Sequence, residues 1–197
     1  LQNKVGTGYA EALRVPLLVR DHTGRFASET TRVRTGLTSS VDLLRLLVDL
    51  GNNGSSTWMQ GDLATLYESR HKILDMVASA DAPGRDYACF TSDEFVQRIL
   101  NFNAAPTHIM ALLQAYTKLV TYNFWTPAST RFSPLDRGVE FYDYATAGGQ
   151  SEMDNQSSDP RVPEQLARLF DQLLPNEVRK PLPASLRAIQ SQQEQAW

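Results

Sequence analysis

The 197-residue sequence has little cysteine, no excess of basic charge and no long apolar run. The single cysteine, Cys89, excludes an internal disulfide and any metal site built from paired cysteines. The 19 basic and 22 acidic residues give a net charge of −3, which argues against a dedicated binder of nucleic acid or anionic membrane. No apolar run approaches the roughly 18–20 residues that span a bilayer. The remaining composition, 42% hydrophobic and 21% charged, is typical of a globular protein.

Familiar catalytic motifs are missing as well. The sequence has no G-x-S-x-G nucleophile elbow, no P-loop and no H-E-x-x-H motif. The histidines, His22, His71 and His108, lack the spacing of a metal site. Asp21 and His22 follow an apolar run, where α/β proteins often bind ligands, but no second group of ligands follows them. A solvated turn is therefore the favoured interpretation there, with a metal site as the alternative.

The first half of the chain predicts one strand followed by helices. Leu13–Val19 is a short apolar run of the kind found in buried parallel strands, although Pro16 donates no ladder hydrogen bond. Val41–Leu50 has an apolar stripe at helical spacing, and Ser39 is placed to cap it. Shorter helical segments are expected at Asp62–Tyr67 and His71–Ala78.

The second half predicts an antiparallel meander closed by a helix. Strands are expected at Asp86–Thr91, His108–Tyr116, Lys118–Trp125 and Val139–Tyr144, which are rich in aromatic and β-branched residues. Arg161–Leu174 matches the apolar spacing of an amphipathic helix, which Pro175 is expected to end. The Gln-rich tail from 181 to 197 gives only a weak helical pattern.

Two residues are candidates for a binding or catalytic role. Lys4 lies in a loop flanked by glycine, and glycine lets a backbone approach a ligand closely. An ammonium in such a loop can hold a tetrahedral anion, although an exposed lysine is the plainer alternative. His108 begins an apolar strand after Pro106-Thr107, where it is either a satisfied edge histidine or part of a substrate pocket.

Several segments resemble the sulfatases of the alkaline-phosphatase-like superfamily. The first is Lys4-Val-Gly-Thr-Gly-Tyr9-Ala-Glu11-Ala-Leu-Arg14-Val-Pro16, because those enzymes run Lys, small residues, Tyr-Glu and Arg-x-Pro before an apolar strand. Thr38–Gly51 is similar to the helix that follows there. The later part of the chain is similar to the family's C-terminal subdomain, at Lys118–Trp125, Glu140–Asp143, Glu152-x-x-Asn155 and the final helix. Ala10 departs from the usual Glu, and the spacing from Lys4 to Tyr9 is one residue longer.

The resemblance implies a fold that is α/β at the front and α+β behind. Residues 1–84 would be the last strand and helices of a large sulfatase-type domain. Residues 85–180 would form a small antiparallel sheet packed by a terminal helix, followed by a tail at 181–197. The chain would then be a C-terminal portion whose missing N-terminal part of the same domain covers an otherwise exposed face. Apolar side chains are accordingly expected to be exposed at Leu13–Val19 and on the Val41–Leu50 helix.

The resemblance also implies a chemistry. Family members cleave sulfate esters with a formylglycine made within a C/S-x-P-x-R motif, beside a divalent metal that is usually calcium. This chain lacks that motif, since Ser133-Pro-Leu-Asp-Arg137 has its proline one place early. The nucleophile and all metal ligands are therefore expected upstream of Leu1, and the isolated chain is expected to be inactive. Lys4 matches the family lysine that contacts the sulfate, and His108 is a candidate substrate-binding residue.

Other interpretations remain open at this point. One is a non-catalytic interaction module on a sulfatase-like scaffold, and another is a phosphate or phosphonate monoester hydrolase or transferase of the same superfamily. A sulfate ester is the expected partner, with no nucleic acid and no transmembrane segment. The residues do not fix the compartment, and the resemblance slightly favours a periplasmic or secreted protein.

Overall fold

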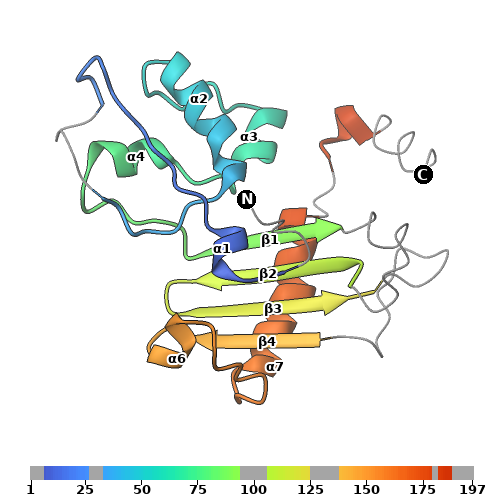
Figure 1. The fold of residues 1–197 in the computed structure, drawn as a ribbon. Coiled ribbons are helices and arrows are strands. Elements are labelled where there is room, and N and C mark those ends of the chain that lie inside the picture. Colours follow the sequence, from blue (N-terminus) through green and yellow to red (C-terminus); the bar gives the residue numbers. More distant parts are fainter. Residues whose placement is uncertain (1–6, 27–32, 94–105, 125–137, 179–181, 188–197) are drawn as a thin grey trace. The chain divides into compact units, whose positions relative to one another are not determined.

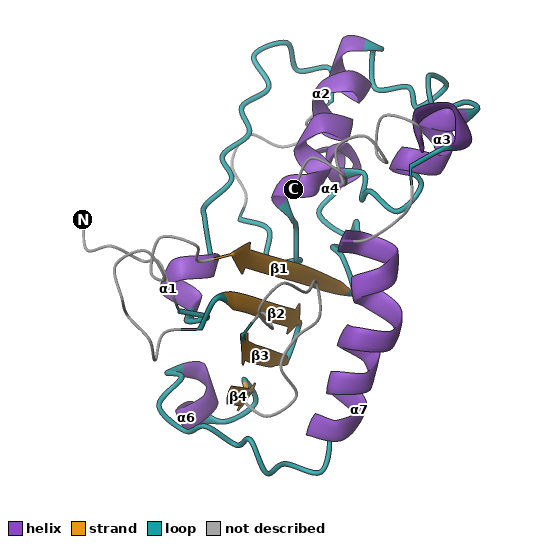
Figure 2. Cartoon of the chain, turned by 90° about the vertical axis from the view of Figure 1, so that its right-hand side faces the viewer, coloured by secondary structure: helices purple, strands orange, loops and turns teal. Residues whose placement is uncertain are grey.

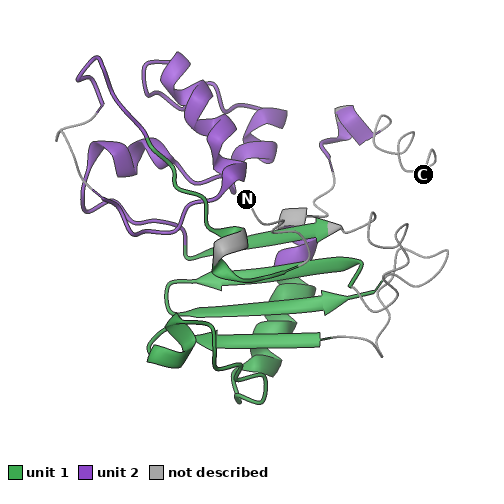
Figure 3. Cartoon of the chain, viewed as in Figure 1, with its two compact units in different colours: residues 1–18, 86–172 green, residues 19–85, 173–197 purple. Residues whose placement is uncertain are grey.

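The computed structural model describes residues 7–26, 33–93, 106–124, 138–178 and 182–187. The chain divides into two compact units, shown in Figure 3. Unit 1 combines residues 1–18 with 86–172, and unit 2 combines residues 19–85 with 173–197. This grouping places residues 1–18 with the sheet, whereas the sequence-based division at 84/85 groups them with the helices that follow.

Unit 1 is built on a four-stranded sheet, in which each strand is antiparallel to the next (Figure 1). The strands follow one another in chain order: β1 (Tyr87–Asp93), β2 (His108–Gln114), β3 (Thr117–Asn123) and β4 (Gly138–Asp143). Only two residues join β2 to β3, and so short a connection favours antiparallel neighbours because a tight turn brings the chain straight back. The predicted meander is confirmed, and the fold class is α+β.

The two faces of the sheet are covered by different segments. Alternate residues of a strand point to opposite faces. Val120 of β3 packs with Ile109, Ala111 and the half-buried Leu13, which ends the short helix α1 (Ala10–Leu13). Figure 2 shows α1 and α7 (Val162–Ala167) on opposite sides of the sheet. We refer to these sides as the α1 face and the α7 face.

The C-terminal helix of the sheet unit continues past the expected stop. After α7, the chain runs on as η2 (Arg168–Val178), a wider helical segment of π type. Leu169 in this segment is buried, as its apolar spacing predicts. The prediction that Pro175 ends the helix is wrong, because Pro175 lies inside η2. A proline ring clashes with the carbonyl of the preceding turn in an α-helix, and a wider turn is one way to accommodate it.

Unit 2 is a cluster of short helices. It contains η1 (Ser40–Asp42), α2 (Leu43–Gly51), α3 (Asp62–Tyr67) and α4 (Ile73–Ala78). Its core consists of Leu46, Ile73 and Leu74, with Phe26, Leu50 and Val77 packed against them. The backbone N–H of Ser39 donates to the Asp42 carboxylate at 3.2 Å, so the predicted helix start is confirmed.

Two further short helices complete the described elements: α6 (Ala147–Gln150) follows β4, and η3 (Ala184–Leu186) lies near the C-terminus. Among the described residues, no helix combines the length and the apolar character needed to cross a bilayer.

The apolar run after α1 is not the strand that the sequence predicts. Leu13 belongs to α1, and the residues from Arg14 to Arg20 are exposed, with no ladder partner in the described part of the chain. Val15 is 82% exposed and Leu18 is 93% exposed. A strand forms only where a neighbouring strand takes up its backbone hydrogen bonds, and this run pairs with none of the four described strands.

Apolar side chains are also exposed on the η1–α2 helix of unit 2. Val41, Leu43, Leu44 and Leu47 are all exposed, and Leu47 is the most open of the four at 63%. The expected exposure of apolar side chains in both segments is confirmed. A solvent-facing leucine row of this kind is unusual, because soluble helices normally turn their apolar stripe to the core.

Candidate functional site

The two residues selected from the sequence are placed differently. Lys4 lies outside the described residues, which begin at Thr7. His108 opens β2 and is only 5% exposed. His108 pairs in register with Asn123 of β3. Asn123 is an odd number of positions from Val120, whose side chain lies on the α1 face, so Asn123 points to the opposite face. His108 therefore lies on the α7 face. Gly8, which follows Lys4 by four positions, lies against Val120 on the α1 face. The sheet therefore lies between Gly8 and His108. The role of His108 in substrate binding stays a prediction.

A buried ion pair dominates the α1 face. The Lys118 ammonium is 2.6 Å from the Glu152 carboxylate, and its side chain is fully buried. The same Nζ donates to the backbone carbonyl of Gly8 at 2.8 Å. Burial lowers the pKa of Lys118, while the Glu152 carboxylate acts in the opposite direction. The Lys118 Nζ thus has both a carboxylate and a carbonyl as partners, as a buried amino group requires.

Glu152 is the other half of the pair, and it reaches the N-terminal segment directly. Its Oε2 accepts from the backbone N–H of Ala10 at 2.8 Å, and its Oε1 accepts from the Tyr144 hydroxyl at 2.8 Å. Burial acts to raise the pKa of Glu152, but the hydrogen bonds from Lys118, Ala10 and Tyr144 outweigh it and hold that pKa below its ordinary value. The carboxylate is therefore ionised and fully partnered.

Gly8 lies against the middle of β3. Its N–H donates to the Tyr122 hydroxyl at 3.2 Å, and that hydroxyl donates in turn to Glu140 at 3.0 Å. Burial raises the pKa of Tyr122, so the phenol stays protonated and can fill both roles. A Cβ at position 8 would lie 2.3 Å from Cγ1 of Val120, so only glycine fits here.

Lys118, Tyr122 and Glu152 thus bind three backbone groups within residues 8–10. We call these three side chains the clamp. Aromatic rings surround it, since Lys118 Nζ lies 5.1 Å from the ring centre of Tyr142. Arg14, just after α1, lies over the ring of Tyr144 at 5.3 Å. The clamp can hold and orient a peptide segment, and its Lys118 Nζ is already engaged by Glu152 and by the Gly8 carbonyl.

Unit 2 has its own buried acidic centre. The Asp42 carboxylate is fully buried and accepts two bonds from the Arg85 guanidinium, at 2.5 and 2.7 Å. It also accepts from the backbone N–H of His71 at 2.8 Å. Asp49, one helical segment later, accepts from the Trp58 indole N–H at 2.7 Å. These contacts tie the helices and loops of the unit together and leave no open coordination position on Asp42.

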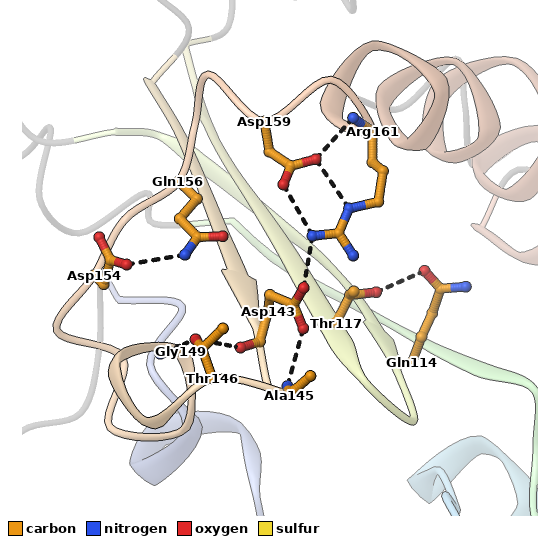
Figure 4. Close-up of polar contacts among 10 residues, drawn as sticks. All are labelled: Gln114, Thr117, Asp143, Ala145, Thr146, Gly149, Asp154, Gln156, Asp159 and Arg161. Carbon is orange, nitrogen blue, oxygen red and sulfur yellow. Dashed lines mark hydrogen bonds and ion pairs between the residues drawn. The ribbon is translucent and has the colours of Figure 1, made fainter.

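An exposed group of charges lies beside β4 (Figure 4). Arg161 donates to Asp143 at 2.7 Å and to Asp159 at 2.9 Å. Hydrogen bonds from Arg161 lower the pKa of Asp159 to about 2. Because these side chains are solvated, the group serves as a comparison for the buried pairs rather than as a candidate site.

The described residues do not fit a divalent metal. Nowhere in the described ranges do three His, Cys, Asp or Glu side chains gather closely enough to hold an ion. Asp21, the sequence-based candidate, instead holds a turn: its carboxylate accepts from the backbone N–H groups of Thr23 and Phe26, both at 2.8 Å. Oxygen atoms used in this way stabilise a loop without needing a cation.

The clamp was not selected from the sequence. One signal was available: Lys118 begins a run of strand-forming residues, Lys-Leu-Val-Thr-Tyr, and a charge in such a strand needs a partner if it is buried. Glu152 begins the Glu152–Asn155 segment that resembles the family's C-terminal subdomain, but that resemblance does not identify Lys118 as its partner. Glu152 adopts a left-handed φ of 55° after α6. Its partner on the N-terminal segment, Ala10, is 142 residues away.

No protein-family model and no curated protein matches the chain in sequence. A solved structure with which it overlaps is "Phosphonate monoester hydrolase SpPMH from Silicibacter pomeroyi", at 21% identity and a TM-score of 0.41. The overlap covers 77% of this chain and 27% of that protein, so this chain spans about a quarter of its length.

Proposed function

We propose that this chain is the C-terminal portion of a hydrolase of the alkaline-phosphatase-like superfamily, and that the complete protein cleaves sulfate esters. Formylglycine and a divalent metal, expected to be calcium, belong to a region upstream of Leu1. Lys4 contributes from this chain by contacting the sulfate. Phosphate and phosphonate monoesters are the alternative substrates within the same superfamily.

The observation that carries the proposal is the order of the family-like segments along the chain. The Lys4–Pro16 segment comes first, the Thr38–Gly51 helix follows, and the sheet and its helix come last. The described fold agrees with the last part, because it contains an antiparallel sheet covered by a C-terminal helix. The exposed apolar side chains from Val15 to Leu18 also agree with a surface that a part of the protein outside this chain would cover.

Lys4 suits the role on chemical grounds. A lysine ammonium is a compact positive charge, and it stabilises the negative charge that develops on sulfuryl oxygens as the ester bond breaks. Removing one well-placed donor of this kind raises a barrier by about 3–4 kcal/mol, which corresponds to roughly 10²–10³ in kcat.

The test uses the complete protein encoded around this chain, assayed with p-nitrophenyl sulfate in the presence of Ca²⁺. We expect Lys4→Ala to lower kcat by roughly 10²–10³. Lys72→Ala is the matched control, because Lys72 lies in unit 2 and makes only a partly exposed ion pair with Asp75. Equal loss in both variants, or no loss with Lys4→Ala, would contradict the proposed role.

The same assay separates the alternatives. Faster turnover of p-nitrophenyl phosphate or of a phosphonate monoester would replace sulfate as the substrate class. No turnover of any of the three by the complete protein would favour a non-catalytic interaction module. The 197-residue chain alone is the negative control, because we expect its nucleophile and metal ligands to lie elsewhere.

A further inference from the structure

The clamp binds the backbone at a specific distance from Lys4. Gly8 follows Lys4 by four positions. Its N–H and C=O are both bound, to the Tyr122 hydroxyl and the Lys118 ammonium, and the Ala10 N–H is bound by Glu152. All three side chains come from the sheet unit, and Lys118 and Tyr122 share one face of β3. The N-terminal segment is thus held through its main chain, whatever its side chains are.

The clamp holds the main chain closer to Lys4 in sequence than the core packing does. Without the clamp, the next contact of this segment with β3 among the described residues is Leu13, which packs with Val120. Leu13 follows Lys4 by nine positions, whereas Gly8 follows it by four. The clamp therefore anchors the backbone five positions nearer to Lys4.

We propose that Lys118, Tyr122 and Glu152 are positioning residues that fix where the segment carrying Lys4 leaves the sheet. This inference rests on the proposed function of Lys4. The ion pair serves the purpose because a buried charge left without its partner is strongly unfavourable, so Lys118 and Glu152 hold each other in place while each also binds the segment. Gly8 allows the close approach to Val120 that brings its carbonyl within reach of Lys118.

The first test measures hydrogen exchange in the 197-residue chain. The variant Lys118→Met with Glu152→Met removes both charges together and keeps unbranched side chains, so no buried charge loses its partner. We expect the amides of Gly8, Ala10 and Arg14 to exchange at least tenfold faster, while amides of the β2–β3 ladder keep their protection. Unchanged exchange in the N-terminal segment would overturn the clamp.

A milder variant guards against loss of the fold. Tyr122→Phe removes only the hydroxyl that accepts from Gly8, and we expect the Gly8 amide alone to lose protection. Asp159→Asn with Arg161→Gln is the matched control, because it removes an exposed ion pair from the same unit without touching the N-terminal segment. That control is expected to exchange like the unmodified chain at residues 8–14.

The second test asks whether the clamp acts through Lys4. In the complete protein, we expect the double methionine variant to lower kcat by about tenfold with little change in KM, and to have no further effect when combined with Lys4→Ala. An equal, additive loss in both backgrounds would overturn the positioning role while leaving Lys4 in the mechanism. No loss with Lys4→Ala alone would overturn the proposed function, and the exchange result would then stand as a purely structural finding.

Discussion

Both units pair a buried carboxylate with a cation, but the contacts of the two carboxylates span very different separations along the sequence. Each contains a buried carboxylate that has a cationic partner and accepts from backbone N–H groups: Asp42 in unit 2 and Glu152 in unit 1. In unit 2, Asp42 and Arg85 are 43 residues apart, whereas in unit 1 Glu152 binds an N–H that is 142 residues away. The helical unit is therefore closed by relatively local contacts. The sheet unit requires a segment from the beginning of the chain before its α1 face is covered.

The cations also differ in kind. Arg85 presents a planar fork and binds Asp42 through two parallel hydrogen bonds, an arrangement that fixes both orientation and distance. Lys118 is a point charge with three donors, and it divides them between Glu152 and the Gly8 carbonyl. The helical unit thus uses its ion pair for rigidity. The sheet unit uses its pair to capture another part of the chain.

The largest effect is expected at Asp42. Asp42→Ala leaves the Arg85 guanidinium, which is only 8% exposed, without its charge partner. Breaking a buried pair in this way costs about 3–5 kcal/mol in the free energy of unfolding. Urea titration monitored by tryptophan fluorescence reports on unit 2 when Trp125→Phe and Trp197→Phe leave Trp58 as the remaining tryptophan, because Trp58 lies in that unit. Asp75→Ala is the control, since Asp75 is 60% exposed. An equal, small change in the free energy of unfolding of both variants would contradict the rigid structural role assigned to the Asp42–Arg85 pair.

A smaller effect is expected at Gly8. Gly8→Ala places a Cβ against Val120 at a distance that no real contact allows, so the segment must move away from β3. Overpacking of this size costs about 1–3 kcal/mol. Adding Val120→Ala opens the space again, so the double variant is expected to lose less than the sum of the two single variants. Strict additivity in thermal unfolding would show that the two positions do not touch.

The smallest effect is a dependence on pH. The pKa of Glu152 lies below its ordinary value of 4.5 in the folded chain, so its interactions stabilise the fold fully above that value. This stability is lost as the pH falls below 4.5 and through the folded-state pKa, because the unfolded chain then binds the proton first. Thermal unfolding between neutral pH and pH 3 measures it. Glu152→Gln is expected to make the unfolding temperature depend less on pH. An unchanged pH dependence would contradict the stabilising role assigned to the Glu152 carboxylate.

The sequence was informative wherever the deciding contacts are local. The helix Asp62–Tyr67 has the bounds that the pattern predicts, and the β2–β3 hairpin follows from two strand-like runs with a short joint. The run from Leu13 to Val19 was assigned wrongly because its apolar residues indicate burial in a sheet, while strand formation depends on a neighbour. Pro175 was expected to stop a helix that instead widens around it.

The sequence alone could not identify the clamp residues as neighbours, for a similar reason. Its members come from β3, from the turn after α6 and from the start of the chain, and nothing local connects these positions. Lys118 could be noticed as a charge in an apolar strand, but Glu152 could not be named as its partner. Lys4 was selected through its glycine neighbours and the family resemblance, and its role stays a prediction.

The long separation between Ala10 and Glu152 has a consequence for biosynthesis. A ribosome adds about 5–20 residues per second, so the residues between them take on the order of 10 s to emerge. Throughout that interval the backbone groups of Gly8 and Ala10 have only water or a chaperone to bind, whereas the Asp42–Arg85 pair can already form. Nascent chains halted before Glu152 should therefore present a folded helical unit behind an undocked leading segment.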